Sequence, residues 1–256
     1  MEDTEDRNFV TALARGLDVL RCFRPNEVEL SNTEIAARTG LPKPTVSRLT
    51  YTLCRLDYLV LVKASGAYRL GPGVLALGYG VLSGLDIAER AAEAMIRLCE
   101  GPNTHVTCSL GERHKLDAVC MAVRSSKEAV SLTVRVGARV PMFTSSLGRA
   151  LICGMNDMEL EYLREVVRAE APETLDEANA QIERARAEFA EYGVTRDFGA
   201  WRPEINGIAV PIRSLNGDRI YGLNVGGPGF LLSPDELMEQ YAPRMMAAAQ
   251  ELSRQA

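Results

Sequence analysis

Seven side chains expected to face outward between residues 43 and 55 donate hydrogen bonds or carry positive charge. They are Lys43, Thr45, Ser47, Arg48, Thr50, Tyr51 and Arg55, and no acidic residue follows until position 57. Such groups suit phosphate oxygens and the base edges exposed in a nucleic-acid groove. Residues 31–70 carry six basic and two acidic side chains, a net charge of +4 in a chain whose formal net charge is −5. A basic patch on an acidic protein is typical of nucleic-acid binding, and the alternative is a solvated polar helix face.

Two predicted helices would position these groups. Ser31 and Glu34 have the spacing of a capping box, and Gly40 suits the left-handed end of the helix that they begin. Pro42 or Pro44 is well placed at the start of the second helix, where its missing N–H costs nothing. Apolar residues then recur at steps of three or four. A small residue at position 36, the glycine at 40 and apolar residues at 46 and 49 together have the spacing of a helix-turn-helix.

The next segment predicts a β-hairpin. Residues 58–63 favour a strand, the sequence SGA a tight turn, and residues 68–70 a return strand. A two-stranded wing directly after the second helix, with a helix over residues 10–23 packed behind, makes a winged helix-turn-helix over residues 10–70. An ordinary hairpin is the alternative for the wing. The residues expected at DNA are Ser31, Lys43, Pro44, Thr45, Ser47, Arg48, Tyr51, Lys63 and Arg69.

Bulk properties limit the other classes of function. The acidic start has no apolar core of a signal peptide, and no apolar run approaches the roughly 18 residues of a membrane span, so we expect a cytoplasmic protein. Six cysteines occur without a CxxC pattern, and we expect them reduced and buried. Cys99, His105, Cys108, His114 and Cys120 lie close in sequence. Strands expected over 103–110 and 115–123 would split them between faces, so we predict neither a zinc site nor a cofactor, although one of them could face a ligand cavity.

Several motifs give the chain a resemblance to a known family. They are LPKPTVSRL at the start of the second helix, YRLGP after the wing, and the stretches over 134–151 and 206–228. In this order they resemble the IclR family of bacterial transcription regulators across nearly the whole chain. The resemblance implies a GAF-like C-terminal domain that binds an effector, and dimers formed mainly by the N-terminal domain that pair further into tetramers.

The remaining periodicity predicts an α/β (α+β) organisation. Residues 1–9 read as a disordered tail, residues 71–84 as a linker helix and residues 85–256 as an effector-binding domain with a largely antiparallel sheet. The expected helices are 86–100, 145–153, 157–167 and 174–192, with a final helix that begins at a second capping box over 233–236 and kinks at Pro243. The expected strands are 103–110, 115–123, 130–136, 194–198, 205–214 and 219–226.

Three polar stretches beside apolar residues are candidate ligand-binding segments. The first begins a helix, where free N–H groups suit a carboxylate, although plain N-capping explains one of its serines equally well. That first stretch is 143–148. The second, 197–207, contains the only tryptophan, and the third, 223–226, is a strand end. The candidate residues are Phe143, Ser145, Ser146, Leu147, Asp197, Trp201, Arg202, Asn206, Gly207, Asn224 and Gly226.

The resemblance implies that these stretches line the effector pocket, with contacts from Ser146, Leu147, Asp197, Gly207, Asn224 and Gly226. Members of the family often have a cysteine at position 207 and serines at 224 and 226. We expect the two glycines to widen the pocket, and Trp201 or Phe143 to form a wall. This favours a larger, aromatic organic acid over an acid of two or three carbons. Arg202 is either its carboxylate partner or part of a surface ion pair.

Two functions from different classes remain. The first is a ligand-responsive transcription regulator that binds a pseudo-palindromic operator. The second is a methyltransferase-like enzyme that uses the winged helix only to dimerise, which requires a glycine-rich nucleotide loop between a strand and a helix. The glycine cluster at 226–229 lies 27 residues from the C-terminus, too close for a following βαβ unit of roughly 30 residues. The sequence therefore favours the regulator and predicts no catalytic residues.

Overall fold

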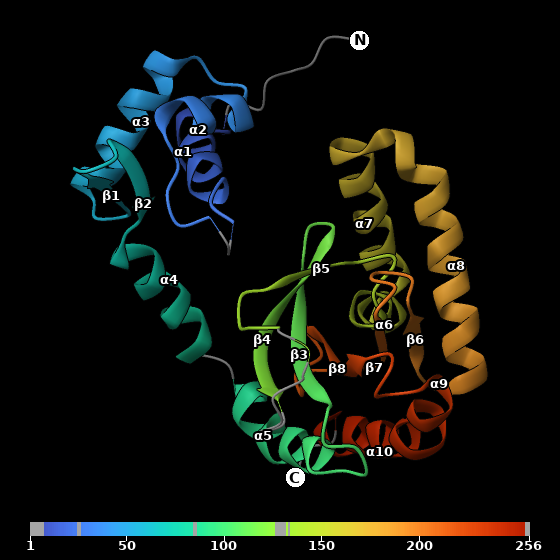
Figure 1. The fold of residues 1–256 in the computed structure, drawn as a ribbon. Coiled ribbons are helices and arrows are strands. Elements are labelled where there is room, and N and C mark those ends of the chain that lie inside the picture. The colour runs from blue at the N-terminus through green and yellow to red at the C-terminus, as the bar shows by residue number, and fades with distance from the viewer. Residues whose placement is uncertain (1–7, 25–26, 84–85, 126–131, 133, 254–256) are drawn as a thin grey trace. The chain divides into compact units, whose positions relative to one another are not determined.

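The computed structural model describes residues 8–24, 27–83, 86–125, 132 and 134–253. The chain divides into two compact units, Met1–Gly84 and Leu85–Ala256 (Figure 1). Seven of the nine residues predicted as a disordered tail lie outside the described part of the chain. None of the helices within that part is long and apolar enough to cross a membrane.

The N-terminal unit is a helical bundle with a short hairpin and a following helix. Its elements are α1 (Thr11–Arg21), α2 (Asn32–Thr39), α3 (Lys43–Arg55), β1 (Leu59–Val62), β2 (Ala67–Leu70) and α4 (Pro72–Ser83). A small core holds it together, built from Val19, Leu30, Ile35, Val46 and Leu59. These apolar side chains are nearly or completely buried, so their removal from water stabilises the packing of the helices against the hairpin.

Local chemistry explains the boundaries of α2 and α3. The Ser31 side chain accepts the Glu34 N–H, and the Glu34 carboxylate accepts the Ser31 N–H at 2.8 Å, which completes the predicted capping box. Gly40 ends α2 in a left-handed conformation with φ of 68°, where a side chain would be strained. Pro42 caps α3 and Pro44 lies in its first turn. The predicted wing is present, and Leu30 extends it through two backbone hydrogen bonds with Tyr68, both of 2.8 Å.

The C-terminal unit is a mixed helix and sheet domain. Its helices are α5 (Asp86–Cys99), α6 (Ser146–Gly154), α7 (Asp157–Glu170), a 3-10 turn η1 (Pro172–Thr174), α8 (Leu175–Tyr192), α9 (Pro234–Glu236), a π-helical turn η2 (Leu237–Tyr241) and α10 (Ala242–Ser253). Its strands are β3 (Thr107–His114), β4 (Asp117–Ser125), β5 (Arg139–Pro141), β6 (Thr195–Phe198), β7 (Ile205–Arg213) and β8 (Ile220–Pro228).

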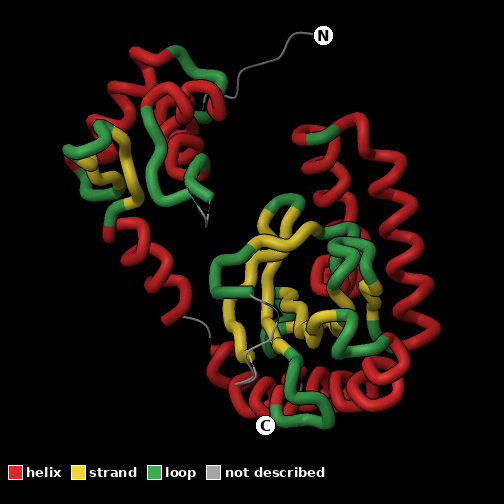
Figure 2. Tube along the Cα trace, in the orientation of Figure 1, coloured by secondary structure: helices red, strands yellow, loops and turns green. Residues whose placement is uncertain are grey.

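The six strands form one antiparallel sheet in the order β5-β4-β3-β8-β7-β6 (Figures 1 and 2). Successive side chains of a strand point to opposite faces. One face packs against α5 and α10 in a core that includes Cys108, Leu110 and Val225. The other face packs against α6, whose Leu147 and Leu151 join a second core. A Cβ at Gly222 would lie 2.6 Å from the end of the Leu147 side chain, so glycine lets α6 approach the sheet this closely without a shift of Leu147.

Three expectations for this unit need correction. Strand β3 begins at Thr107 and not at 103, because the Asn103 side chain accepts the His105 N–H at 2.9 Å and holds a turn before the strand. The strand expected over 130–136 lies partly outside the described residues, and its described members are not in a strand; β5 pairs with β4 instead. Only half of the second capping box forms, since the Glu236 carboxylate accepts the Asn103 amide at 3.2 Å.

The final helix is irregular where a kink was predicted. The π-helical turn η2 ends at Tyr241, immediately before Ala242 and Pro243. A proline removes one helical hydrogen-bond donor and crowds the preceding turn, and an adjacent wide turn is a common way to accommodate this. Ser233 still caps the start of the helix by accepting the Glu236 N–H at 3.1 Å.

Candidate nucleic-acid interface and ligand cavity

Helix α3 presents most of its predicted DNA contacts to solvent. Lys43, Pro44, Ser47, Arg48 and Tyr51 are exposed, and two-thirds of the Tyr51 surface is accessible. Thr45 is half-buried. In the described part of the chain, neither Lys43 nor Arg48 forms an ion pair. Their charges are therefore available to an external anion such as a phosphate.

Three polar side chains near α3 already have structural partners. The Ser31 hydroxyl donates to Glu34 at 2.6 Å in the capping box. The Asn32 amide donates to the Ser47 hydroxyl at 2.9 Å and joins the start of α2 to α3. Arg38 pairs with Glu27 and donates to the Cys22 carbonyl at 2.8 Å. Arg38 thus stabilises the unit, and the accessible positive charge comes from the other basic residues.

The wing carries the remaining two candidates. Lys63 and Arg69 are exposed on either side of the turn, where Gly66 has a φ of 69°. The Arg69 guanidinium donates to the Leu70 carbonyl at 3.2 Å. Both side chains lie on the same hairpin and are long enough to contact a phosphate backbone beside the groove that α3 would occupy.

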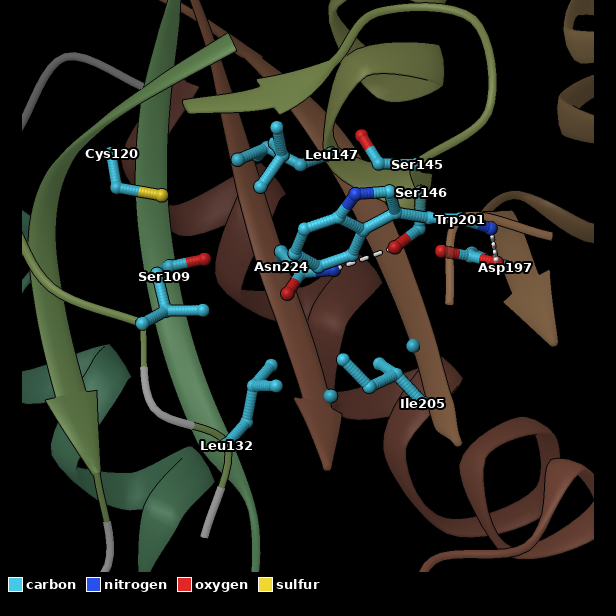
Figure 3. Close-up of a pocket in the computed structure, with 14 residues that line it drawn as sticks. Ser109, Cys120, Leu132, Ser145, Ser146, Leu147, Asp197, Trp201, Ile205 and Asn224 are labelled. Atoms are coloured by element: carbon cyan, nitrogen blue, oxygen red, sulfur yellow. Dashed lines mark hydrogen bonds between the residues drawn. The ribbon is translucent and has the colours of Figure 1, made fainter. Parts of the chain in front are cut away.

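A cavity lies in the C-terminal unit between the first turn of α6 and the sheet (Figure 3). It contains about 370 Å³ of empty space, including its open mouth. The lining residues are Ser109, Cys120, Leu132, Val134, Val140, Ser145, Ser146, Leu147, Asp197, Trp201, Ile205, Gly207, Asn224 and Gly226. All three segments predicted from the sequence therefore contribute to one cavity.

The two serines at the start of α6 have different roles. Ser145 is the N-cap: its hydroxyl donates to the Pro141 carbonyl at 2.6 Å and accepts the Gly148 N–H at 3.0 Å. The backbone N–H groups of Ser146 and Leu147 make no hydrogen bond within the described residues. N-capping therefore accounts for Ser145, whereas two free N–H groups and the positive end of a helix dipole remain at the cavity.

Asn224 lies on β8, next to the start of α6. Its amide nitrogen donates to the Ser146 hydroxyl at 2.8 Å and to the Ile208 carbonyl at 3.0 Å (Figure 3). A Cβ at Gly207 would lie 3.1 Å from the Ser146 hydroxyl and 3.4 Å from the Asn224 amide. A side chain at position 207 would press on Ser146 and Asn224, so glycine leaves room for the hydrogen bond between them, and the widening of the pocket by the glycines stays a prediction.

Asp197 and Trp201 form one wall. The Asp197 carboxylate is buried and accepts the Ala200 N–H at 2.8 Å and the Trp201 N–H at 3.1 Å. Burial raises the pKa of the Asp197 carboxyl, while the two backbone N–H groups and the charge of Arg149 lower it. The Trp201 ring lies between Leu147 and Asn224 in Figure 3. The guanidinium of Arg202 lies 4.7 Å from the centre of this ring.

A buried ion pair connects the start of α6 to the strand that carries Asp197. Arg149 of α6 pairs with Glu188 of α8 and donates to the Arg196 carbonyl at 2.7 Å. Arg196 also pairs with the same carboxylate and lies over the ring of Tyr192 at 3.9 Å. This network joins α6, α8 and β6, so it fixes the position of the α6 start relative to Asp197.

Three predicted ligand contacts lie outside the lining of the cavity. Phe143 packs against the α6 core. Arg202 is exposed and stacks on Trp201, so it forms neither the cavity wall nor an ion pair among the described residues. The Asn206 amide is buried and donates to the Leu232 carbonyl at 2.9 Å. Its role is to join β7 to the segment that precedes α9.

Six lining residues were not among the sequence candidates. They are Ser109, Cys120, Leu132, Val134, Val140 and Ile205. Ser109 pairs directly with Asn224 across β3 and β8, so a correct register for these strands identifies it. Cys120 fulfils the expectation that one residue of the Cys/His segment faces a cavity. Burial raises the pKa of its thiol to about 11, against the lowering effect of a hydrogen bond with Ser109.

The Cys/His segment forms no ligand cluster in the structure. Cys108 points into the α5 and α10 core, and His105 precedes β3 and is not on a strand face as expected. Among the described residues, no group of three or more His, Cys, Asp or Glu side chains is arranged to hold a metal ion.

Comparison with known proteins gives two family matches. Residues 12–62 match the model of the IclR helix-turn-helix domain. Residues 79–254 match the model of the bacterial transcriptional regulator IclR C-terminal domain. The second match alone covers more than half of the chain, and the two together follow the division into two units.

Individual relatives agree with these matches. The chain is 30% identical to the Pca regulon regulatory protein of Pseudomonas putida over 98% of this chain and 86% of that protein. It is similar in structure to an IclR family transcriptional regulator from Brucella abortus, with a TM-score of 0.84, 38% identity, and coverage of 99% and 95% of the two chains. An IclR homologue from Microbacterium hydrocarbonoxydans, solved in complex with 4-hydroxybenzoate, gives a TM-score of 0.69 and 26% identity over 94% of this chain and 97% of that one.

These matches explain why a helix-turn-helix unit and a cavity-bearing unit occur in one chain, and they exclude the methyltransferase-like alternative. The chain belongs to the IclR family and is a ligand-responsive, DNA-binding transcription regulator, not an enzyme.

Proposed function

We propose that a dimer of this protein binds a pseudo-palindromic operator in the cytoplasm and responds to a small aromatic acid bound in the C-terminal cavity. Each α3 would enter a major groove, and each wing would contact the adjacent backbone. The exposed cations of α3, which form no ion pair among the described residues, carry this proposal. Lys43 and Arg48 are free to reach phosphates or base edges, and the hydroxyls of Thr45, Ser47 and Tyr51 lie on the same helix.

Exposed apolar side chains support assembly through the N-terminal unit. On α1 and the segment before it, Phe9, Val10 and Leu13 each expose more than half of their surface. On α4, Leu75 is 76% exposed and Tyr79 is 68% exposed. Large apolar side chains grouped on helices are typical of interaction surfaces. A dimer that covers them would present two α3 helices to successive major grooves, and pairing of the C-terminal units would give a tetramer.

The cavity supports an acidic effector. The free N–H groups of Ser146 and Leu147, at the start of a helix, favour a carboxylate. Trp201 offers a flat apolar wall that suits an aromatic ring. The complex of a similar protein with 4-hydroxybenzoate is consistent with such a ligand. Effector binding would change operator affinity through α4, which joins the two units in sequence, if the ligand binds one arrangement of the winged helices better than another.

Capture of genomic DNA fragments by the purified protein provides the operator for a direct test. We expect Arg48→Ala to weaken binding to the captured fragment by about tenfold, while the melting temperature stays unchanged. Arg184→Ala is the matched control, because Arg184 is an exposed arginine on α8 that forms no ion pair among the described residues. Equal operator affinity of wild type, Arg48→Ala and Lys43→Ala would contradict the role assigned to α3.

A further inference from the structure

A tight turn joins the end of α3 to the first strand of the wing. Asp57 lies in this turn with a φ of 60°, a left-handed conformation that is unfavourable for a residue with a side chain. The Asp57 N–H donates to the Cys54 carbonyl at 3.2 Å, and the Tyr58 N–H donates to the Leu53 carbonyl at 2.9 Å. These bonds fix the directions in which the carbonyl groups of Asp57 and Tyr58 point relative to α3.

The start of α4 is attached to these two carbonyl groups. The Gly71 N–H donates to the Tyr58 carbonyl at 2.8 Å, and the Gly73 N–H donates to the Asp57 carbonyl at 3.2 Å. The first N–H groups of a helix have no partner within the helix, so here the turn after α3 supplies the partners. The last turn of α3 and the first turn of α4 are therefore joined through the backbone.

Two glycines make this close attachment possible. A Cβ at Gly71 would overlap the Asp57 carbonyl oxygen and lie 3.0 Å from the carbonyl carbons of Asp57 and Tyr58. All of these are backbone atoms, which cannot move aside as the end of a side chain can. A Cβ at Gly73 would lie 3.1 Å from the same oxygen and 3.2 Å from the Tyr58 ring. Alanine should thus displace the start of α4 strongly at position 71 and mildly at position 73.

The rest of α4 is not held in this way. Residues 75 to 81 are all exposed, and α4 extends from the hairpin away from α1 and α2 in Figure 1. A Cβ at Gly80 would meet no atom within 4 Å, in contrast to Gly71 and Gly73. A helical segment acts as a semi-rigid spacer. The direction of α4 relative to α3 is therefore set at the first turn of α4.

We propose that the joint formed by Asp57, Gly71 and Gly73 determines which spacing of operator half-sites the dimer accepts. This inference rests on the proposed dimer and operator, and it makes Gly71 a positioning residue for α3. Two DNA-binding units bind one operator together only if their separation and rotation match the two half-sites. A stiff joint prevents simultaneous binding to mismatched half-sites, whereas a loose joint lets α3 turn to meet a displaced one. The stiffness of the joint therefore gives the dimer its specificity for one spacing.

The full-length protein is titrated with three DNA fragments, after hydroxyl-radical footprinting has located the half-sites in the captured operator. The first fragment is the operator itself. The second has two more base pairs between the half-sites, which rotate one half-site by about 70° relative to the other. The third has a single half-site and measures the binding of one α3 without any requirement for spacing. Light scattering measures the assembly state of each protein.

We expect wild type to bind the operator about tenfold or more tightly than the fragment with two additional base pairs. Gly71→Ala should reduce this ratio to about twofold, and Gly73→Ala should give an intermediate ratio. Gly80→Ala is the matched control on the same helix and should keep the wild-type ratio, because its side chain meets no other atom. The affinity for the single half-site and the dimeric state should be the same in all four proteins.

The outcomes separate the inference from the proposed function. Equal binding of both two-site fragments by wild type, or a wild-type ratio in Gly71→Ala, would overturn the inference and leave operator binding intact. Loss of half-site binding or of the dimer in Gly71→Ala would assign Gly71 to folding or assembly and would also overturn it. Failure of wild type to bind any fragment would overturn the proposed function and the inference with it. The comparison of Gly73→Ala with Gly80→Ala is decisive where Gly71→Ala does not fold.

Discussion

The carboxylate of Asp197 accepts a hydrogen bond from the backbone N–H of Trp201 at 3.1 Å. The same oxygen accepts the Ala200 N–H at 2.8 Å. These bonds hold the turn after β6 and set the place where the tryptophan side chain enters the cavity. A carboxylate that is needed for the turn is thus buried beside the site proposed for a ligand, and its ionisation should affect stability.

Asp197→Asn should become more stable relative to wild type as the pH rises through and above the ordinary aspartate pKa. Burial raises the pKa of the Asp197 carboxyl in the folded state. The folded protein then binds this proton more tightly than the unfolded chain, so the free energy of unfolding of wild type falls as the pH rises over that range. An asparagine oxygen can accept the same two N–H groups without a charge. Urea unfolding of both proteins at several pH values measures the difference.

The control for this prediction is the pH range below the ordinary aspartate pKa. There Asp197 is protonated in both states, and the difference between the two proteins should be smallest. A difference that shrinks as the pH rises would show that the ionised carboxylate stabilises the fold and would contradict the assignment.

Trp201→Ala should change the preference of the cavity in favour of larger acids. Trp201 lines the cavity (Figure 3), and removal of its indole ring frees space there. We expect a two-ring acid such as 2-naphthoate to gain on the order of tenfold in affinity relative to 4-hydroxybenzoate. Isothermal titration calorimetry gives the dissociation constants of both acids, since Trp201→Ala has no tryptophan fluorescence to follow. Trp201→Phe, which keeps an aromatic wall, should show a smaller shift, and an unchanged ratio in Trp201→Ala would remove the ring from the wall.

Ser31→Ala should destabilise the N-terminal unit more than it affects contact with DNA. The Ser31 hydroxyl is used within the capping box, where it donates to Glu34 at 2.6 Å. Loss of an N-cap serine lowers the free energy of unfolding by about 1 kcal/mol. Chemical denaturation followed by circular dichroism measures this change. Weaker operator binding without any loss of stability would instead support the direct DNA contact predicted from the sequence.

Leu75→Glu should disrupt the proposed dimer. Leu75 is 76% exposed on α4, so a charged residue is tolerated in the monomer but would be buried without a partner in an interface. We expect the dissociation constant of the dimer to rise by about tenfold or more, as it does when a residue that dominates an interface is replaced. Size-exclusion chromatography with light scattering measures it. Leu75→Met keeps the apolar surface and should remain dimeric. If Leu75→Glu forms dimers at the same protein concentration as wild type, the interface lies elsewhere.

The sequence predicted the N-terminal unit well because its signals are local. The capping box at Ser31, the left-handed glycine at position 40 and the hairpin after α3 each depend on residues within a few positions of one another. In the C-terminal unit the same holds for α8, which ends at Gly193 with a φ of 70°, as its apolar spacing and terminal glycine indicated.

The parts that were missed depend on contacts between distant segments. Asn103, which holds the turn before β3, donates to the Leu231 carbonyl at 2.7 Å, and Glu236 leaves its predicted cap to accept the same amide. Ser109 enters the cavity because β3 pairs with β8, more than 100 positions later in the chain. Arg202 is polar and near the site in sequence, yet it stacks on the outside of Trp201. Such relationships follow from the sheet order, which local patterns do not contain.

The most direct test of the account is the operator affinity of one protein measured with and without its acid. A labelled fragment of the captured operator is titrated with the protein and followed by fluorescence anisotropy. The titration is made without acid and again at a concentration of 4-hydroxybenzoate that saturates the change in Trp201 fluorescence. The account predicts that the acid changes the operator dissociation constant by about fivefold or more. An operator affinity that is identical with the cavity empty and saturated would contradict the claim that the two units act as one ligand-responsive regulator.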